Sequence, residues 1–344
     1  MKLPKALPKL LLGWYEQNKR MLPWRENRDP YRVWVSEIML QQTRVEAVKG
    51  YYARFLEALP TVEALASCDD DRLHKLWEGL GYYSRVRNMK KCAIAIVEDH
   101  GGKFPQNHEA ILALPGVGAY TAGAICSICF DMPTPAVDGN VLRVVSRLLD
   151  DATPIDLPTH KKAVQKALEE IYPQAAGSFT QALMELGATV CGPNRQPVCE
   201  SCPCSEVCLS FHRCTAASLP VKTPKKGRRE EDRTVLILRC DGRYAVLQRP
   251  GSGLLAGLWQ LPDMEGRLEA AQVLKYLEEL GAKPRELLRQ TDKKHIFTHI
   301  QWNMRGFYLE LAAAPDLWQW YTEAEILENI PLPTAYRQFW EDRI

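Results

Sequence analysis

The segment from residue 191 to residue 208, CGPNRQPVCESCPCSEVC, contains five cysteines. Four of them have the spacing C-x7-C-x2-C-x5-C, namely Cys191, Cys199, Cys202 and Cys208. Cysteines this dense form disulfides, bind a zinc ion or bind an iron–sulfur cluster, and each kind of bond ties one loop together. The segment therefore constrains the fold more than any other stretch of the sequence.

The expected compartment bears on the choice among these bonds. Residues 1–20 scatter lysine and proline among apolar positions and contain no small-residue cleavage site, and the sequence has no apolar run long enough to span a bilayer. We therefore expect a cytoplasmic address. Disulfides are rare in that reducing compartment, and 11 cysteines are an odd number.

The spacing then separates zinc from a cluster. Zinc sites usually present two C-x2-C pairs, whereas one C-x2-C pair flanked by single cysteines suits a four-cysteine iron–sulfur site. The pattern favours a [4Fe-4S] cluster over zinc, with a loop of free thiols as the third alternative. Cys204 stays unassigned.

The sequence before residue 215 is helical in pattern. A chain of 344 residues with 46% hydrophobic residues is long enough for two domains. Residues 33–59, 159–172 and 177–191 repeat apolar side chains at spacings of three and four, which is the helical period. We expect a mostly helical domain over residues 1–215.

The sequence after residue 231 has a different texture. Residues 233–249 are two apolar runs around Asp241-Gly242, which predicts a hairpin, and residues 267–282 predict a helix closed by Gly281. We expect an α/β domain over residues 232–344. Between the domains, residues 216–231 form a basic linker that is either a solvated tether or an arm that follows DNA: Lys222, Lys225, Lys226, Arg228 and Arg229.

A tight turn in the helical part could meet a phosphate. In LPGVG, residues 114–118, Gly116 and Gly118 bracket Val117 between an apolar helix and a helix that begins near Tyr120. Such a turn lets backbone N–H groups and a helix N-terminus approach a phosphate, although a plain helix–helix turn has the same pattern. Further along, Asp138 precedes an apolar helix, where an N-cap is its ordinary role.

These motifs together resemble a known superfamily. The LPGVG turn, the aspartate that follows it and the late cysteines resemble the endonuclease III superfamily of DNA glycosylases. Within it, four further motifs resemble the mismatch adenine DNA glycosylases, the MutY family: LPWR at 22–25, VSEIMLQQT at 35–43, GLGYYSRVRN at 79–88 and VDGNV at 137–141. The resemblance extends from about residue 11 to residue 208 and continues more weakly beyond.

The resemblance implies a catalytic pair. Cleaving a purine N-glycosidic bond requires an acid for the departing base and a negative charge below the developing oxocarbenium ion. Glu37 would be the general acid, with a pKa raised by apolar neighbours, and Asp138 would stabilise or trap the sugar cation, held by Asn140 and Tyr120. Without the resemblance, Glu37 would be interpreted as a salt-bridged glutamate on an exposed helix face.

Position 120 bears on the outcome of the reaction. Members that also nick the strand carry a lysine there, which forms a Schiff base with the sugar. Tyr120 has no amine, so the resemblance implies a monofunctional glycosylase that leaves an abasic site.

The resemblance also implies how the base is held. Chemistry on a base inside a duplex requires that the base be flipped out of the stack. Gln42 and Tyr82 match residues that wedge into the gap. Four residues match the lining of the adenine pocket, where amide, guanidinium and aromatic groups suit a purine: Trp24, Arg25, Leu40 and Gln181.

The C-terminal domain resembles a Nudix domain that lacks part of its metal site. Where the Nudix motif has Arg-Glu before its pair of glutamates, this chain has Leu274 and Lys275, so hydrolase activity is disfavoured. In the family, such a domain recognises 8-oxoguanine opposite adenine, and the recognition loop matches Phe297, Thr298 and His299. The alternative is that these three residues belong to an ordinary alternating strand.

The resemblance implies that Cys191, Cys199, Cys202 and Cys208 hold a structural [4Fe-4S] cluster, whose loop would present basic residues such as Arg195 to phosphate. The first gap here is seven residues where the family usually has six. The expected partner is double-stranded DNA with an adenine mispair, bound by a monomer in the nucleoid. A net charge of +2 is too small to bind DNA by its overall field, so local basic surfaces would carry the binding.

Three other functions remain alternatives. An iron–sulfur DNA-damage binder without catalysis would have no use for both Glu37 and Asp138. A nucleotide diphosphatase acting through the C-terminal domain is disfavoured by Leu274 and Lys275. A thymine glycosylase shares a tyrosine at position 120 in some members, but VDGNV and the C-terminal domain separate the two classes.

Overall fold

The computed structural model describes residues 1–193, 196–224 and 227–343. They form two compact units. The first contains Met1–Ser67 and Arg87–Pro224, and the second contains Cys68–Val86 and the C-terminal part of the chain. Arg195, Lys225 and Lys226, which the sequence analysis singled out as basic, lie outside the described residues. Within the described part of the chain, no helix is long and apolar enough to cross a bilayer.

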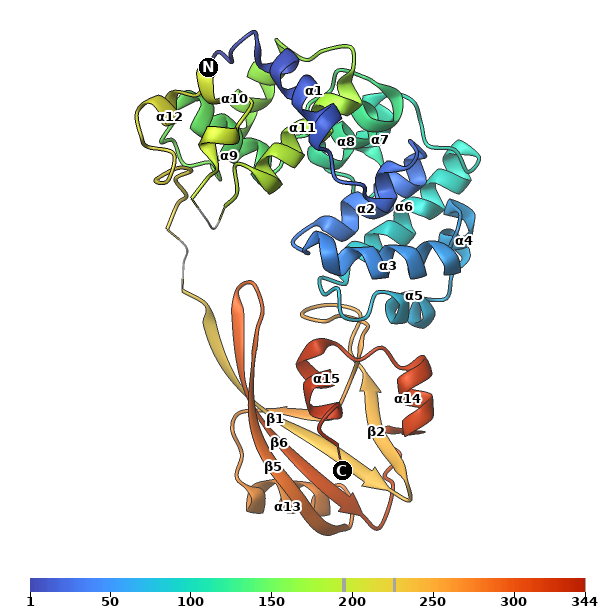
Figure 1. The fold of residues 1–344 in the computed structure, drawn as a ribbon. Coiled ribbons are helices and arrows are strands. Elements are labelled where there is room, and N and C mark those ends of the chain that lie inside the picture. The colour runs from blue at the N-terminus through green and yellow to red at the C-terminus, as the bar shows by residue number, and fades with distance from the viewer. Residues whose placement is uncertain (194–195, 225–226, 344) are drawn as a thin grey trace. The chain divides into compact units, whose positions relative to one another are not determined.

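The first unit is helical, as predicted (Figure 1). Its elements in chain order are α1 (Leu7–Asn18), η1 (Pro23–Arg25), α2 (Pro30–Leu40), α3 (Val45–Ala58), α4 (Val62–Ser67), α6 (Ser84–His100), whose first residues belong to the other unit, α7 (His108–Ala113), α8 (Ala119–Phe130), α9 (Gly139–Leu149), α10 (Pro158–Glu169), α11 (Ala176–Thr189), η2 (Cys199–Ser201), η3 (Ser205–Val207) and α12 (Leu209–His212).

Helix α11 is central to this unit, because it packs against α1, α8 and α9, while α2 packs against α3 and α8. The buried side chains of α1, α9, α10 and α11 form one apolar core that also includes Cys204. These contacts bring residues from the first forty positions beside residues near 120, 140 and 185. The helical period of residues 33–59 continues across two helices, which separate at Gln42, whose φ is 60°.

The second unit contains helix α5 (Asp70–Leu76) and a mixed sheet. The strands are β1 (Arg229–Cys240), β2 (Arg243–Gln248), β3 (Trp259–Gln260), β4 (Asp263–Glu265), β5 (Pro284–Ile296), β6 (Ile300–Leu311) and β7 (Gln319–Thr322). The strand order is β3-β2-β1-β6-β5, with β4 on β1 and β7 on β2. Strands β1 and β6 are parallel, and the other pairs are antiparallel.

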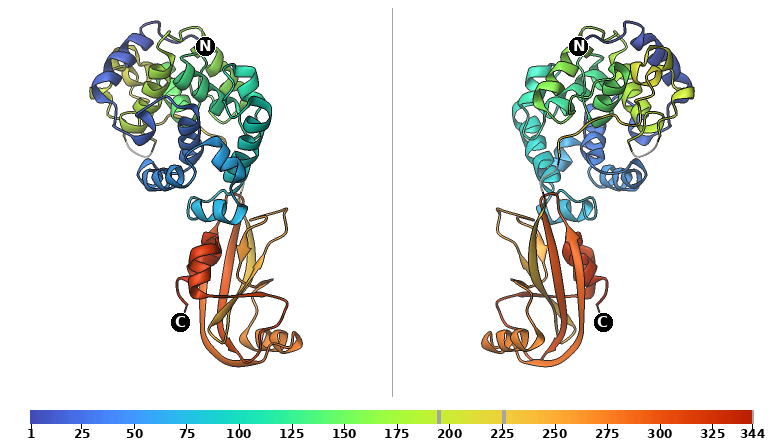
Figure 2. Two further views of the ribbon diagram at one scale, coloured as in Figure 1. Left: turned by 90° about the vertical axis from the view of Figure 1, so that its right-hand side faces the viewer. Right: turned by 90° about the vertical axis from the view of Figure 1, so that its left-hand side faces the viewer.

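Both faces of this sheet are covered, because the strands alternate apolar side chains to either side. Val235 and Ile237 pack with α14 (Glu323–Asn329) and α15 (Thr334–Trp340), whereas Leu236 and Leu238 pack with α13 (Ala270–Glu279) on the opposite face (Figure 2). The predicted hairpin is confirmed, with positive φ at the turn residue Asp241.

Part of the segment assigned to the linker packs on the helical unit. Arg147 Nε donates to the Leu219 carbonyl at 3.0 Å, and Ile155 N donates to the Val221 carbonyl at 3.0 Å. Thr223 N donates to Asp156 Oδ1 at 3.0 Å. Residues 219–223 are therefore held on the helical unit by hydrogen bonds to their backbone rather than left as a free tether.

Candidate active site

Glu37 lies in the interior of the helical unit. Helix α2 begins at Pro30 after Asp29, whose Oδ1 accepts a hydrogen bond from Arg32 N at 2.8 Å. Two turns later, Glu37 is 6% exposed and accepts a hydrogen bond from the Tyr120 hydroxyl. The interpretation of Glu37 as an exposed, salt-bridged glutamate is wrong, because its side chain is buried and its hydrogen-bond partner is a tyrosine hydroxyl.

Burial changes the acidity of Glu37. Loss of hydration raises its pKa from 4.5 to about 7, and the nearby Asp138 adds to the increase. The hydrogen bond from Tyr120 and the charge of Arg25 act in the opposite direction. A carboxyl group with this pKa is partly protonated at neutral pH and can give up a proton there.

Asp138 caps helix α9 and faces the same site. Its Oδ1 accepts from Val141 N at 2.8 Å, and its Oδ2 accepts from Asn140 Nδ2 at 2.6 Å. Burial raises its pKa, although these hydrogen bonds and Arg143 counteract the increase. Asp138 is therefore the N-cap of α9, and the hydrogen bond from Asn140 fixes the position of its second carboxylate oxygen, Oδ2.

A buried arginine connects Asp138 to the cysteine segment, and sequence reasoning missed it. Arg143 Nη2 donates to Asn140 Oδ1 and to the Gly187 carbonyl, both at 2.8 Å, and Arg143 Nε donates to the Cys191 carbonyl at 2.8 Å. An arginine in the apolar run of α9, three residues after Asn140, was the available signal.

Tyr120 stands at the start of α8, opposite Glu37. Besides its hydrogen bond to Glu37, its hydroxyl lies 4.0 Å from Met184 Sδ on α11. Burial, with the neighbouring carboxylates, raises the pKa of Tyr120 well above its usual value, so the phenol stays neutral.

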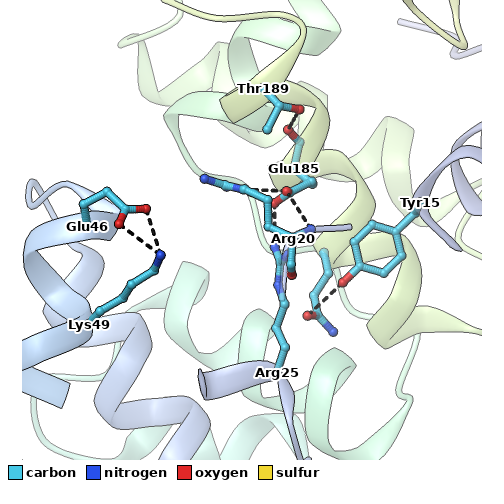
Figure 3. Close-up of polar contacts among 8 residues, drawn as sticks. Tyr15, Arg20, Arg25, Glu46, Lys49, Glu185 and Thr189 are labelled. Carbon is cyan, nitrogen blue, oxygen red and sulfur yellow. Dashed lines mark hydrogen bonds and ion pairs between the residues drawn. The ribbon is translucent and has the colours of Figure 1, made fainter. Parts of the chain in front are cut away.

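The residues assigned to the base pocket lie around η1 and α11. Arg25 Nη2 is 2.8 Å from Glu185 Oε2, and the Tyr15 hydroxyl donates to Gln181 Oε1 at 3.1 Å (Figure 3). Trp24 is buried edge-on against Tyr52. Leu40 is half-buried at the end of α2. Sequence reasoning missed Tyr15 and Glu185, because their partners are more than 150 residues away along the chain.

The two residues assigned to the wedge are both exposed and both have positive φ. Gln42 has φ 60° in the break between α2 and α3, and Tyr82 has φ 47° with 47% of its surface exposed. Gln42 belongs to the first unit and Tyr82 to the second, where the Tyr82 hydroxyl lies 3.0 Å from Thr298 Oγ1. Positive φ is uncommon outside glycine, and both wedge residues share it.

The LPGVG segment forms the predicted turn between α7 and α8. Gly116 has φ 74°, and a Cβ there would lie 2.6 Å from Asn88 Cβ, so a glycine is required. Val117 is buried, whereas Gly118 caps α8 without a side-chain hydrogen bond. The first N–H groups of α8 consequently have no side-chain cap from the residue that precedes them.

The cysteine segment surrounds η2 and η3. Burial raises the pKa of Cys199, and the charges of Cys202, Cys208 and Cys191 add to this, so the four thiols lie within electrostatic reach of one another. In the part of the chain that the structure describes, no three His, Cys, Asp or Glu residues form a group that could hold a metal ion. Cys204 is buried in the helical core and donates a hydrogen bond that lowers the pKa of Cys202.

Phe297, Thr298 and His299 form the loop that joins β5 to β6. Phe297 N donates to the Ile300 carbonyl at 2.8 Å, which leaves Thr298 and His299 exposed at the tip. The Phe297 ring packs edge-on against Trp302 at 4.9 Å between centroids. The alternative of an uninterrupted strand is therefore wrong.

The glutamates of α13 are arranged differently. Glu278 and Glu279 are exposed, and Glu279 pairs with Lys275 at 3.8 Å, with side chains 65% and 78% exposed. A lysine beside a carboxylate competes with a divalent cation for it. The described residues of α13 therefore do not gather the carboxylates that metal-assisted hydrolysis needs.

Comparison with known proteins first defines the class. Residues 35–174 match a family described as "HhH-GPD superfamily base excision DNA repair protein", and residues 233–342 match the NUDIX domain. A solved thermostable thymine-DNA glycosylase is 31% identical with a TM-score of 0.56, covering 61% of this chain and 97% of that one. A trapped endonuclease III–DNA covalent intermediate, 23% identical with a TM-score of 0.52, covers 62% of this chain and 99% of its own, and shows the fold alone.

Curated relatives narrow the class further. The adenine DNA glycosylase of Mus musculus is 37% identical over 366 residues, which cover 89% of this chain and 70% of the mouse protein. That of Homo sapiens is 36% identical over 382 residues, covering 92% and 70%. The chain belongs to the adenine DNA glycosylase family.

Proposed function

We propose that this protein removes adenine paired with 8-oxoguanine or guanine in DNA by hydrolysing the N-glycosidic bond. The observation that carries the proposal is the buried carboxyl of Glu37, whose pKa lies at about 7 and which faces both Tyr120 and Asp138. A proton donor and a second carboxylate in the same site are the pair that glycoside cleavage requires.

In this proposal, Glu37 gives its proton to N7 of adenine as the bond to the sugar lengthens. Asp138 stabilises the oxocarbenium ion below the ring or bonds to it transiently, and the amide of Asn140 at 2.6 Å fixes the carboxylate that does so. General-acid catalysis of this kind contributes about 10²- to 10⁴-fold to the rate.

The strand remains uncut. A Schiff base with the opened sugar needs an amine, and the group that faces Glu37 at position 120 is a neutral phenol. The product is therefore an abasic site, and the enzyme is monofunctional.

Recognition is divided between the two units. In the helical unit, the flipped adenine is held by Trp24, Arg25, Leu40 and Gln181, and Gln42 fills the gap that it leaves. Tyr82, which belongs to the second unit, is the other residue of the wedge. The turn Gly116-Val117-Gly118 meets a phosphate through backbone N–H groups. The exposed loop of Phe297, Thr298 and His299 contacts the 8-oxoguanine, with the Thr298 hydroxyl as a hydrogen-bond group.

The cysteine residues Cys191, Cys199, Cys202 and Cys208 would hold a [4Fe-4S] cluster. Four cysteine thiols in one segment are the ligand set of such a cluster, and Arg147 Nη1, 3.2 Å from Cys191 Sγ, suits a thiolate ligand. When bound, the cluster ties the loop together and takes no part in base removal. The fold around it supplies the link from Cys191 through Arg143 to Asn140.

Single-turnover excision from duplexes that differ only in the base opposite adenine tests the proposal. We expect adenine loss from the 8-oxoguanine:adenine and guanine:adenine duplexes and none from thymine:adenine. Thr298→Ala should reduce the advantage of 8-oxoguanine over guanine by about tenfold, which corresponds to one hydrogen bond. Binding without any base loss would instead support the DNA-damage binder.

A further inference from the structure

The helical unit contains a buried carboxylate that base removal, as proposed above, does not use. Glu185 lies on α11 with its side chain fully buried, whereas glutamates are almost never fully buried unless they are paired. It accepts from Arg20 Nε at 2.6 Å, Arg20 Nη2 at 3.0 Å, Arg20 N at 3.2 Å and Arg25 Nη2 at 2.8 Å (Figure 3). Burial alone would raise the pKa of Glu185, but these hydrogen bonds outweigh it and the pKa lies below its usual value.

The pair with Arg25 leads toward the catalytic acid. Arg25 Nη1 donates to the Arg20 carbonyl at 3.1 Å, so both terminal nitrogens of Arg25 are committed and its side chain is only 15% exposed. The charge of Arg25 also reaches Glu37, whose pKa it lowers. Arg25 is therefore paired with the Glu185 carboxylate, and its charge acts on Glu37 together with the Tyr120 hydroxyl and Asp138.

A second contact fixes the amide of Gln181. Gln181 and Glu185 are four residues apart on α11 and therefore share one face of the helix. The Arg25 guanidinium lies 5.7 Å from the centroid of the Tyr15 ring, and the Tyr15 hydroxyl donates to Gln181 Oε1. With its oxygen occupied, Gln181 presents its Nε2 donor, which suits an acceptor nitrogen of adenine and not the N1–H of guanine or hypoxanthine.

We propose that Glu185 is a positioning residue of the base pocket, which holds Arg25 in place and neutralises it so that Glu37 retains its proton at neutral pH. This inference rests on the proposed function, because it takes Glu37 as the acid and Arg25 as a pocket residue. Glu185 itself touches neither the base nor the sugar in this account.

The pH dependence of single-turnover adenine excision separates this role from a merely structural one. In Glu185→Gln, Arg25 loses its counter-charge and favours ionised Glu37, so the alkaline limb of the profile moves to lower pH. In Arg25→Gln, the positive charge itself is lost, so the limb moves to higher pH. Both changes break the same ion pair, yet the limbs move in opposite directions, which general loosening of the pocket would not produce.

The rate itself should also fall. We expect Glu185→Gln to lower the single-turnover rate constant at neutral pH by about 10- to 100-fold, the cost of a misplaced pocket side chain. Glu341→Gln breaks the exposed pair between Arg337 and Glu341, 2.8 Å apart at the end of α15, and is the matched control, with the wild-type rate and profile. Limbs that move in the same direction, or a wild-type profile in Glu185→Gln, would overturn the inference.

Two further variants keep the test decisive. If Glu185→Gln does not fold, the double variant Glu185→Gln/Arg25→Gln removes both members of the Arg25–Glu185 pair. It leaves Arg20, which is 37% exposed and screened by solvent, so the alkaline limb should coincide with that of Arg25→Gln. A double-variant limb at lower pH than that of Arg25→Gln would mean that Glu185 acts independently of Arg25, which contradicts the proposal. Glu37→Gln runs in parallel: if it retains excision, the proposed function fails, whereas if it is inactive, a negative result concerns Glu185 alone.

Discussion

The two units carry pairs of acidic side chains in opposite environments. Glu37 and Asp138 are enclosed by α2, α8 and α9, and burial raises the pKa of both. Glu278 and Glu279 lie on the exposed side of α13, where Lys275 contacts Glu279. Exclusion of water raises the pKa of a carboxyl group and so favours a proton donor at neutral pH. The difference supports the proposal that base removal takes place in the helical unit.

The largest effect should come from the buried pair. Glu37→Gln keeps the shape of the side chain but cannot donate the carboxyl proton, so we expect the single-turnover rate of adenine removal to fall by about 10²- to 10⁴-fold. Duplex binding, measured by the same mobility shift as for the wild type, should persist. Adenine removal by Glu37→Gln at the wild-type rate would contradict the role of Glu37 as the acid, and burial would then not distinguish the catalytic pair from the exposed one.

A change at the edge of the site should have a smaller effect. Gly187→Ala places a Cβ 2.6 Å from Asn140 Cβ, which pushes away the residue that holds Asp138. We expect excision to slow by about 10- to 100-fold. Gly13→Ala is the control, because a Cβ there meets nothing within 4 Å in α1. Equal rates in the two variants would mean that Asn140 does not need its present position.

The pH profile gives the next effect. Glu37 must be protonated, and its pKa is raised to about 7, so the single-turnover rate should decline above neutral pH by about tenfold per unit. Asp138 must be ionised, and because burial raises its pKa, the acidic limb should lie above the ordinary range for aspartate. Because Asp138 acts on the pKa of Glu37, the acidic and alkaline limbs of the pH profile report the titration of the two residues together. A rate that stays flat from pH 6 to pH 9, a range chosen to span about two units above and one below the Glu37 pKa, would contradict the assignment of Glu37 as the acid.

The smallest effect should come from the exposed pair. Glu279→Gln removes a solvated contact with Lys275, and exposed ion pairs contribute little. We expect unchanged adenine excision and no release of pyrophosphate from 8-oxo-dGTP with Mg²⁺, with or without the substitution. Pyrophosphate release by the wild type that disappears in Glu279→Gln would restore the diphosphatase alternative.

The sequence predicts local features well and distant contacts poorly. The two units' classes, the hairpin at Asp241 and the turn at Gly116 follow from period and turn chemistry. The burial of Glu37 could be predicted only from the family motif. A single glutamate among apolar residues is equally compatible with a solvent-facing position. The apolar spacing of residues 33–59 could not show the break at Gln42, since the same spacing continues in the next helix.

The contacts that were missed join residues far apart along the chain. Glu185 meets Arg20 and Arg25 only because α11 packs beside the segment after α1, and Arg143 reaches Cys191 only because α9 and the cysteine segment are neighbours. The association of Cys68–Val86 with the C-terminal part of the chain likewise depends on tertiary packing. Pattern within one segment carries no information about such partners.

The most direct test of the account is single-turnover incubation with a duplex that carries one 8-oxoguanine:adenine pair, analysed with and without alkali. The account predicts cleavage at the adenine position only after alkali, because Glu37 and Asp138 remove the base and Tyr120 provides no amine to cut the strand. A strand that is nicked without alkali would contradict the monofunctional assignment. A bound duplex without any alkali-labile site would contradict the catalytic role of Glu37 and Asp138.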